Sequence, residues 1–439
     1  MAPQAERWKI LFQVFDPRQR LSEVQQDLYV SRPGAVADKV RQQIPFEPTG
    51  KWIIAGSLGS GKSSELVHLG RALWDDYTIV ALDLPFSVAR VDRLTPTEIL
   101  FLIGAAGLHR AKAEMISVPN KVKDALSSAF AGVLDPTKAG HVNASELLQG
   151  VALFVSNLAA PGNAAASGAA LGAARLATGI LGGATRSVRE GELAVADLLG
   201  AVEEILRLIA PDGRPPLVLV DGLDKIQDRG AIRSLFGESR LLSQLAAPSV
   251  YSGPITLMLS ALWKTVGDVF RCERLTNVVV RHPPASWVEL DPQRVEEGRL
   301  ALRHVVERRL ARFSLGVEDV FASDALEEIL SSSGGVLRDL VHIVNRCCPL
   351  AHDQAAGGSS TRIDRPLARQ AIEELRKELE ITLTGKRVAE LRYVKENGEP
   401  SGDGEASDDL LLNGYVLPYA NGRVWFEPHP LLSGVRPGL

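Results

Sequence analysis

The sequence predicts an α/β protein in which a parallel β-sheet is covered by helices and is followed by a helical region and a final β-hairpin. Short apolar runs alternate with stretches of helical periodicity through the first 290 residues, which is the pattern of β-α-β units. A glycine-rich segment joins the first apolar run to the first helical stretch. After residue 291 the pattern is helical until two short apolar runs flank Asn421-Gly422, which is a strong hairpin signal.

Each element follows from a local pattern. The predicted strands are 51–55, 78–84, 216–226, 255–261 and, as the fifth, either 277–281 or 287–290. A helix after residue 63 carries leucines at helical spacing. Thr95-Pro96-Thr97-Glu98 is a capping box that begins another helix. The resulting regions are an N-terminal extension (1–49), a sheet domain (50–290) with a helical insertion at about 105–200, a helical region (291–355) and a C-terminal module (363–439).

The composition is that of an ordinary globular chain, with 45% hydrophobic and 23% charged residues. It excludes disordered, fibrous and small disulfide-rich classes, and a net charge of −4 excludes a basic surface over the whole chain. The cysteines Cys272, Cys347 and Cys348 fit neither a disulfide framework nor a zinc site. With no secretion signal in the N-terminal residues, we expect a reducing, cytoplasmic location. The longest uncharged run, 147–174, contains proline and asparagine, which disfavours a membrane span.

One stretch has an unusual composition. In the segment 159–185, 17 of 27 residues are Ala or Gly. These side chains bury too little surface for a core element, so we expect an insertion on the sheet domain. It is either a weakly packed helical hairpin or an arm that contacts a partner or a membrane.

Residues 56–63 form a phosphate-binding motif. They read Gly-Ser-Leu-Gly-Ser-Gly-Lys-Ser, which fits G-x-x-x-x-G-K-[ST] between a predicted strand and a predicted helix. Lys62 would reach the β- and γ-phosphates of ATP, and the Ser63 hydroxyl would bind Mg²⁺. The residues predicted to bind ATP or ADP through this loop are Gly56, Ser57, Leu58, Gly59, Ser60, Gly61, Lys62, Ser63 and Ser64.

An acidic residue ends the third predicted strand. Four apolar residues, 217–220, lead into Asp221, which is therefore the candidate carboxylate for Mg²⁺. Asp224 lies three residues further on and is a candidate to orient or activate the attacking water. The alternative for Asp224 is a helix N-cap.

The segment Val220-Asp221-Gly222-Leu223-Asp224 resembles the NACHT-type acidic motif of the STAND branch of P-loop ATPases, which are relatives of AAA+ proteins. The resemblance implies a bacterial P-loop NTPase with a three-layer parallel sheet, a helical lid and a C-terminal winged-helix domain. Gly222 stands where AAA+ enzymes carry a catalytic glutamate, and Lys225 stands where the family has a second acid. Both departures predict slow ATP hydrolysis, suited to a molecular switch.

Residues 331–340 resemble the sensor-2 motif of AAA+ lids, notably those of the origin-recognition type. The resemblance implies that Arg338 leans over the γ-phosphate, whereas the plain alternative is a solvated arginine. Ser260 ends the fourth predicted strand, where the family keeps a polar sensor-1 residue, and a capping serine is the alternative. Tyr29 and Val30 stand where relatives contact adenine.

Two arginines, Arg271 and Arg274, precede the fifth predicted strand, roughly where oligomeric relatives place an arginine finger. A surface arginine is the favoured interpretation of each. The C-terminal module 363–439 resembles a winged helix, but its 10 Lys/Arg against 13 Asp/Glu favour protein contact or autoinhibition over DNA binding.

The sequence therefore predicts an ATPase switch in signalling or defence, which uses Mg²⁺ and ATP. It would act on a separate effector or sensor protein and form a homo-oligomer when ATP binds. The alternatives are a DNA-associated AAA+ loader and a nucleotide-bound scaffold without turnover.

Overall fold

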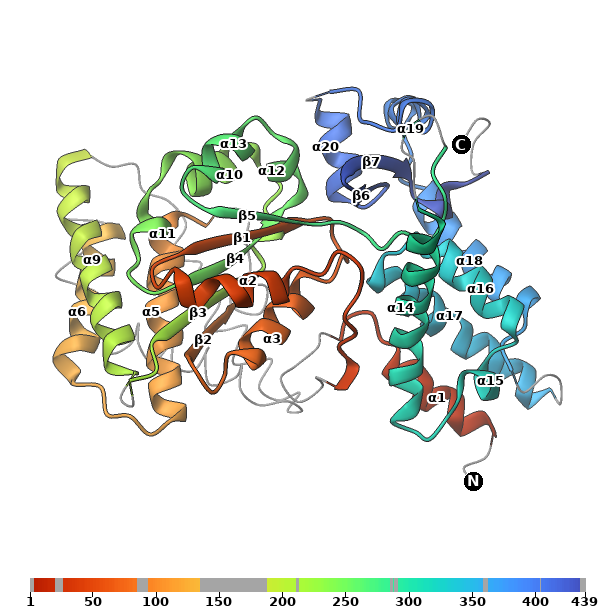
Figure 1. Cartoon of the computed structure of the whole chain (residues 1–439), viewed down its shortest axis with the longest axis horizontal. Coiled ribbons are helices and arrows are strands. Elements are labelled where there is room, and N and C mark those ends of the chain that lie inside the picture. The colour runs from red at the N-terminus through yellow and green to blue at the C-terminus, as the bar shows by residue number, and fades with distance from the viewer. Residues whose placement is uncertain are drawn as a thin grey trace. The chain divides into compact units, whose positions relative to one another are not determined.

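The computed structural model describes residues 4–19, 27–84, 94–134, 188–210, 213–284, 287, 291–357, 362–402 and 404–434 (Figure 1). The chain folds as two compact units. One consists of residues 37–55 and 69–273 and holds most of the sheet, while the other consists of residues 1–36, 56–68 and 274–439. The predicted mixed α/β fold is confirmed.

A five-stranded sheet forms the core of the α/β region. Its strands are β1 (Lys51–Gly56), β2 (Thr78–Asp83), β3 (Pro216–Asp221), β4 (Ser249–Pro254) and β5 (Arg271–Leu275), in the order β2-β3-β4-β1-β5. The β2–β3 and β3–β4 pairs are parallel. Every residue of the inner strand β1 is buried, which suits the apolar run 52–55 within it.

The fourth and fifth strands differ from the prediction. Residues 255–259, predicted as strand, form helix α12 (Ile255–Leu259), and the strand precedes them as β4. The periodicity of a short apolar run does not distinguish a buried helix from a buried strand. In addition, the serines of β4 hide the apolar pattern of the true strand. The fifth strand is β5 and not 277–281, while the alternative 287–290 lies, except for Trp287, outside the described residues. Its polar sequence suits an edge strand, which is open to solvent on one side.

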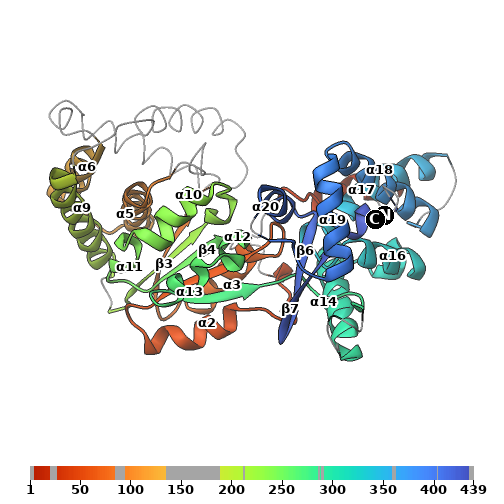
Figure 2. The ribbon, with the colours of Figure 1, turned by 90° about the horizontal axis from the view of Figure 1, so that it is seen from above.

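Helices accompany the sheet. They are α2 (Ala37–Gln43), η2 (Ile44–Phe46), α3 (Lys62–Ala72), α5 (Pro96–Ala113), α6 (Asn120–Leu134), α9 (Val188–Leu208), η4 (Leu223–Lys225), α10 (Arg229–Ile232), η5 (Arg233–Glu238), α11 (Leu241–Gln244), α12 and α13 (Leu262–Gly267). The predicted capping box is confirmed, because the Thr95 hydroxyl accepts from the Glu98 N–H and the Glu98 carboxylate accepts from the Thr95 N–H. Helices α5, α6 and α9 pack together (Figure 2).

Gly104 and Gly107 allow this close approach, because a Cβ on either would lie 2.9 Å from a side-chain atom of α6 or α9. The Ala/Gly-rich stretch 159–185 lies outside the described residues. Within the described part of the chain, no helix has both the length and the apolar character that crossing a membrane requires.

The second unit is helical and ends in a hairpin. Its elements are α1 (Gln4–Val14), α14 (Pro292–Ala311), α15 (Val317–Val320), α16 (Ser323–Ser332), α17 (Leu337–Ala356), α18 (Arg365–Glu380), α19 (Gly385–Asn397), α20 (Glu405–Leu412), β6 (Val416–Asn421), β7 (Arg423–Pro428) and η6 (Pro430–Leu432). The antiparallel hairpin turns at Gly422, as predicted, with a φ of +73°.

The first helix belongs to the core of this unit. Trp8 and Leu11 of α1, and Phe15 just after it, are buried in one hydrophobic cluster with side chains from α14 to α18. The Asn345 amide of α17 also donates to the Phe12 carbonyl at 2.6 Å. This part of the N-terminal extension is therefore an integral layer of the helical region.

Candidate nucleotide-binding site

The phosphate loop joins β1 to α3. Gly59 and Gly61 have φ values of +81° and +99°, a backbone region that glycine enters without steric cost. The buried Lys62 ammonium donates to the carbonyls of Gly56 at 2.9 Å and Ser57 at 2.7 Å. The loop therefore curls around the lysine side chain at the N-terminus of α3.

The residues of this loop fit the phosphates of a nucleotide. The Ser60 hydroxyl oxygen is buried and has no hydrogen-bond partner among the described residues. A Cβ on Gly59 or Gly61 would lie 2.8 or 2.9 Å from a neighbouring side-chain atom, so the loop has no room for a larger residue at either position. Backbone N–H groups at a helix N-terminus, together with a lysine, suit an anion.

The start of α17 lies against the same glycines. The nearest neighbours of a Cβ built on Gly59 are Val336 Cγ1 at 2.8 Å and Arg338 Cβ at 3.1 Å. For Gly61 the neighbour is Leu337 Cδ1 at 2.9 Å. Arg338 is exposed, and its guanidinium forms no hydrogen bond or ion pair within the described part of the chain. The structure thus brings the predicted sensor arginine to the edge of the phosphate loop.

A segment before α2 is attached to the start of α3. The Tyr29 ring stacks on His68 with 3.9 Å between centroids, and its hydroxyl donates to Glu65 at 3.3 Å. The other Glu65 oxygen accepts from the Val36 N–H at 2.9 Å. Tyr29 and its neighbour Val30, predicted to contact adenine, therefore belong to a segment anchored beside the loop.

The sequence analysis missed Arg32. Its guanidinium is buried and donates to the carbonyl of Ser60 in the phosphate loop at 2.6 Å and to that of Thr276 at 3.0 Å. Burial lowers the pKa of Arg32 from its ordinary value. Nothing in the local sequence marks this residue, because both partners are distant along the chain.

The predicted magnesium ligand Asp221 is the last residue of strand β3 in the sheet. Asp221 is in register with Asp83 at the end of β2. The Gly222 N–H donates to the carboxylate of Asp221 and to the Ser252 hydroxyl of β4, both at 2.8 Å. Gly222 has a φ of +97°, so a glutamate here would be strained. This backbone conformation is a physical reason for glycine at this position.

Asp224 lies inside the short helix η4, whose N-cap is Gly222. The capping alternative for Asp224 is therefore wrong. The capping aspartate of this region is Asp228, which accepts from the Ala231 N–H at the start of α10.

The basis for Ser260 as a sensor is also wrong. It follows helix α12 and its hydroxyl donates to the Leu257 carbonyl at 3.0 Å, instead of ending a strand. Arg271 and Arg274 lie within β5 and do not precede the fifth strand. Arg271 forms an ion pair with Glu47 at 2.8 Å.

The sheet, its parallel strands and the loop between β1 and α3 define the class: a mixed α/β protein with the phosphate-binding loop of P-loop nucleotide-binding proteins. No family profile and no curated protein matches the sequence.

Two solved structures resemble the whole chain. Cdc6p from Pyrobaculum aerophilum is 14% identical, covers 96% of each chain and has a TM-score of 0.38. The Orc1 protein of Aeropyrum pernix, solved in complex with DNA, is 13% identical and has a TM-score of 0.41. The match covers 97% of this chain and 95% of the Orc1 chain. Because both scores lie below 0.5, the class stands on the sheet and the loop.

Proposed function

We propose that this protein is an ATP-binding, slowly hydrolysing ATPase of the AAA+/STAND type that acts as a nucleotide-dependent switch. One observation carries the proposal. The residues that begin α17, with the uncommitted Arg338 among them, lie against the glycines of the phosphate loop. A helix that starts at the loop is placed to respond to the phosphates bound there.

The roles follow from the residue types. The loop N–H groups and Lys62 bind the phosphates of ATP or ADP, and Ser63 with Asp221 holds Mg²⁺, which neutralises charge on the phosphates when bound. Among the described residues there is no group of three or more His, Cys, Asp or Glu side chains suited to a metal. Mg²⁺ at a P-loop needs few carboxylates, because phosphate and water oxygens complete its shell.

Hydrolysis is expected to be slow. Gly222 offers no carboxylate at the place of the family's catalytic glutamate, which leaves Asp224 as the candidate to orient water. Arg338 contributes charge to the γ-phosphate and so distinguishes ATP from ADP. Release of that contact after hydrolysis would free α17, which is an order–disorder or hinge switch.

The test compares nucleotide affinities of variants. Lys62→Ala should abolish binding of ATP and ADP. Arg338→Ala should weaken a non-hydrolysable ATP analogue about 10- to 100-fold, the worth of a charge-assisted hydrogen bond, while leaving ADP unchanged. The matched control is Arg346→Ala on the same helix, since Arg346 pairs with Glu378 at 2.7 Å. Equal losses for ATP and ADP in Arg338→Ala would contradict the sensor role.

The assembly and partner proposals need a second measurement. Light scattering should show a larger particle with the ATP analogue than with ADP. The larger particle is then expected to bind a separate effector or sensor protein. A constant size would exclude a nucleotide-driven oligomer.

The DNA-associated alternative is less favoured by the C-terminal module. On α19, the basic Arg387 is committed to an ion pair with Asp409 at 2.5 Å. Salt-sensitive, ATP-dependent binding of a DNA duplex would nevertheless establish that alternative. Absence of phosphate release with tight nucleotide binding would establish the scaffold alternative.

A further inference from the structure

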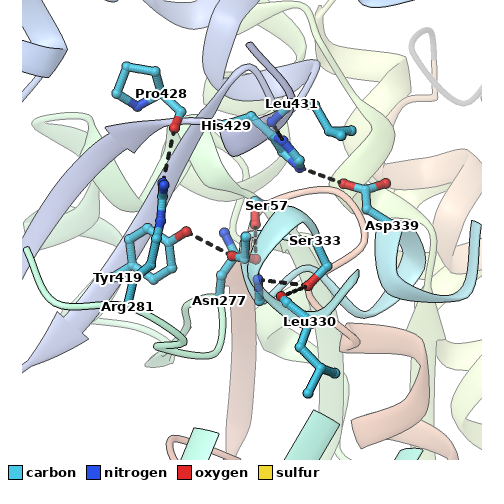
Figure 3. A network of polar contacts seen from close by, with 12 residues as sticks. Ser57, Asn277, Arg281, Leu330, Ser333, Asp339, Tyr419, Pro428, His429 and Leu431 are labelled. Atoms are coloured by element: carbon cyan, nitrogen blue, oxygen red, sulfur yellow. Dashed lines mark hydrogen bonds and ion pairs between the residues drawn. The ribbon is translucent and has the colours of Figure 1, made fainter. Parts of the chain in front are cut away.

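A buried asparagine connects the phosphate loop to the C-terminal hairpin. The hydroxyl of Ser57, in the loop, donates to the side-chain carbonyl of Asn277 at 3.0 Å (Figure 3). Ser57 is 0% exposed and Asn277 is 3% exposed. The backbone N–H of Asn277 in turn donates to the carbonyl of Pro418 in β6 at 3.0 Å. One residue between β5 and α14 therefore binds both the loop and the hairpin.

The hairpin continues the connection to the start of α17. The Tyr419 hydroxyl of β6 donates to the Gly334 carbonyl at 2.7 Å, in the turn that precedes α17. The Val278 N–H, next to Asn277, donates to the Gly335 carbonyl at 3.2 Å. Linker, hairpin and turn thus form a closed ring of hydrogen bonds just before α17, and the loop is joined to this ring through Ser57.

A histidine after the hairpin completes the attachment. The Leu431 N–H donates to Nδ1 of the buried His429 at 3.1 Å, so Nε2 carries the proton. Nε2 therefore donates to the Asp339 carboxylate at 3.0 Å. Figure 3 shows this contact between His429 and Asp339. Asp339 follows Arg338 in the sequence, so the end of the hairpin is attached next to the predicted sensor.

Asn277 keeps a polar group that the surrounding fold does not satisfy. Its Nδ2 is buried and has no hydrogen-bond partner among the described residues. Buried polar groups are nearly always paired in proteins, and each exception calls for an explanation. An amide whose acceptor half is used by the loop and whose donor half is unused is suited to change partners when the loop moves.

We propose that Asn277 is a positioning residue that sets the conformation of the phosphate loop through Ser57 and conveys that conformation to β6. The proposal rests on the proposed nucleotide binding. When a nucleotide rearranges the loop carbonyls around Lys62, the Ser57–Asn277 bond shifts, and the hairpin responds at Pro418 and Tyr419.

Trp425 of β7 offers a reporter of the hairpin. It is 2% exposed and stacks on Tyr419 with 5.6 Å between ring centroids. The full chain would be labelled with 5-fluorotryptophan, and the ¹⁹F resonance of Trp425 assigned from Trp425→Phe. Saturating Mg²⁺ with ADP or a non-hydrolysable ATP analogue should shift this resonance in the unmodified protein.

Two variants remove the same bond from opposite sides. Asn277→Ala and Ser57→Ala should each still bind nucleotide, several-fold more weakly, but lose the Trp425 shift, and the double variant should add nothing further. Ser57→Ala deletes only a hydroxyl, so it serves if Asn277→Ala fails to fold. The matched control is Ser407→Ala, a buried serine that donates to Glu390 at 2.6 Å in the same C-terminal module, and it should retain the shift.

The outcomes are separable because calorimetry reports nucleotide binding independently of the resonance. Tight binding with an unmoved Trp425, or a full shift in both variants, would overturn the coupling role of Asn277 and leave nucleotide binding intact. No calorimetric binding to the unmodified protein would overturn the proposed function and the coupling with it.

Discussion

Gly335 shows how closely the turn before α17 is packed. Its φ is +73°, and a Cβ there would lie 1.8 Å from the Val278 carbonyl oxygen. Gly335→Ala should cost about 2–4 kcal/mol of unfolding free energy, from left-handed backbone strain and overpacking together. Chemical denaturation followed by circular dichroism measures the change.

Gly422 is the matched control for Gly335. It has the same φ of +73°, but a Cβ there would meet no atom within 4 Å. Gly422→Ala should therefore cost only the strain of about 1–2 kcal/mol. Equal losses in the two variants would show that the turn before α17 tolerates movement.

The burial of Lys51 makes the free energy of unfolding depend on pH. Lys51 is 4% exposed, and burial lowers its pKa from 10.5 to about 8. Between these values the unfolded chain holds a proton that the folded chain has released, so stability rises with pH through this window. Below pH 8 the lysine is charged in both states and its burial cost is fully present.

Lys51→Met removes this titration. From pH 7.5 to 10, the unmodified protein should gain about 2–3 kcal/mol relative to the variant. Urea unfolding of both proteins at each pH gives the difference and cancels the other titrating groups. A difference that does not change with pH would mean that Lys51 titrates near its ordinary value.

At the scale of residues, the sequence predicted those functional residues that belong to a contiguous motif. The loop 56–63 is a motif, so its position between a strand and a helix could be predicted from neighbours alone. Arg32 and Asn277 could not, because their partners Thr276 and Ser57 lie 244 and 220 residues away. Only folding brings such residues together, and a single sequence holds no record of the pairing.

At the scale of elements, the packing of α1 against the helical region depends largely on one side chain. Trp8 is 1% exposed within the core of the helical region. Trp8→Ala should cost about 3–5 kcal/mol, seen as a lower urea midpoint. Phe12→Ala, on the same helix but 41% exposed, should cost less than about 1 kcal/mol. Similar losses would contradict the packing of α1.

The strand β4 explains why element prediction failed where it did. Its serines form hydrogen bonds with the backbone: the Ser252 hydroxyl accepts from the Gly222 N–H beside Asp221, and the Ser249 hydroxyl donates to the Ala247 carbonyl. They remove the apolar signal from the true strand, and the apolar run that follows belongs to α12. By contrast, β1 and β3 bury apolar side chains throughout their centres and were predicted within a few residues.

At the scale of the whole molecule, the three thiols occupy two different environments. Cys347 and Cys348 are buried in α17, and burial raises the pKa of Cys348 to about 12. Cys272 is partly exposed in β5. In the native protein at pH 8, iodoacetamide should modify Cys272 alone, as read by mass spectrometry of peptides.

Urea should open all three sites to the reagent. Modification of Cys347 or Cys348 at the rate of Cys272 without denaturant would show that the core around α17 opens readily. Thiolates react and thiols do not, so both the pKa and the burial protect this pair.

The packing of α1 on α17 also bears on how the chain is made. The Phe12–Asn345 hydrogen bond spans 333 residues. At a synthesis rate of about 5–20 residues per second, that interval takes roughly 17 to 67 seconds. Until then, Trp8, Leu11 and Phe15 lack part of the cluster that buries them. The apolar face of the first helix therefore remains exposed during synthesis until its partner helix α17 has been made.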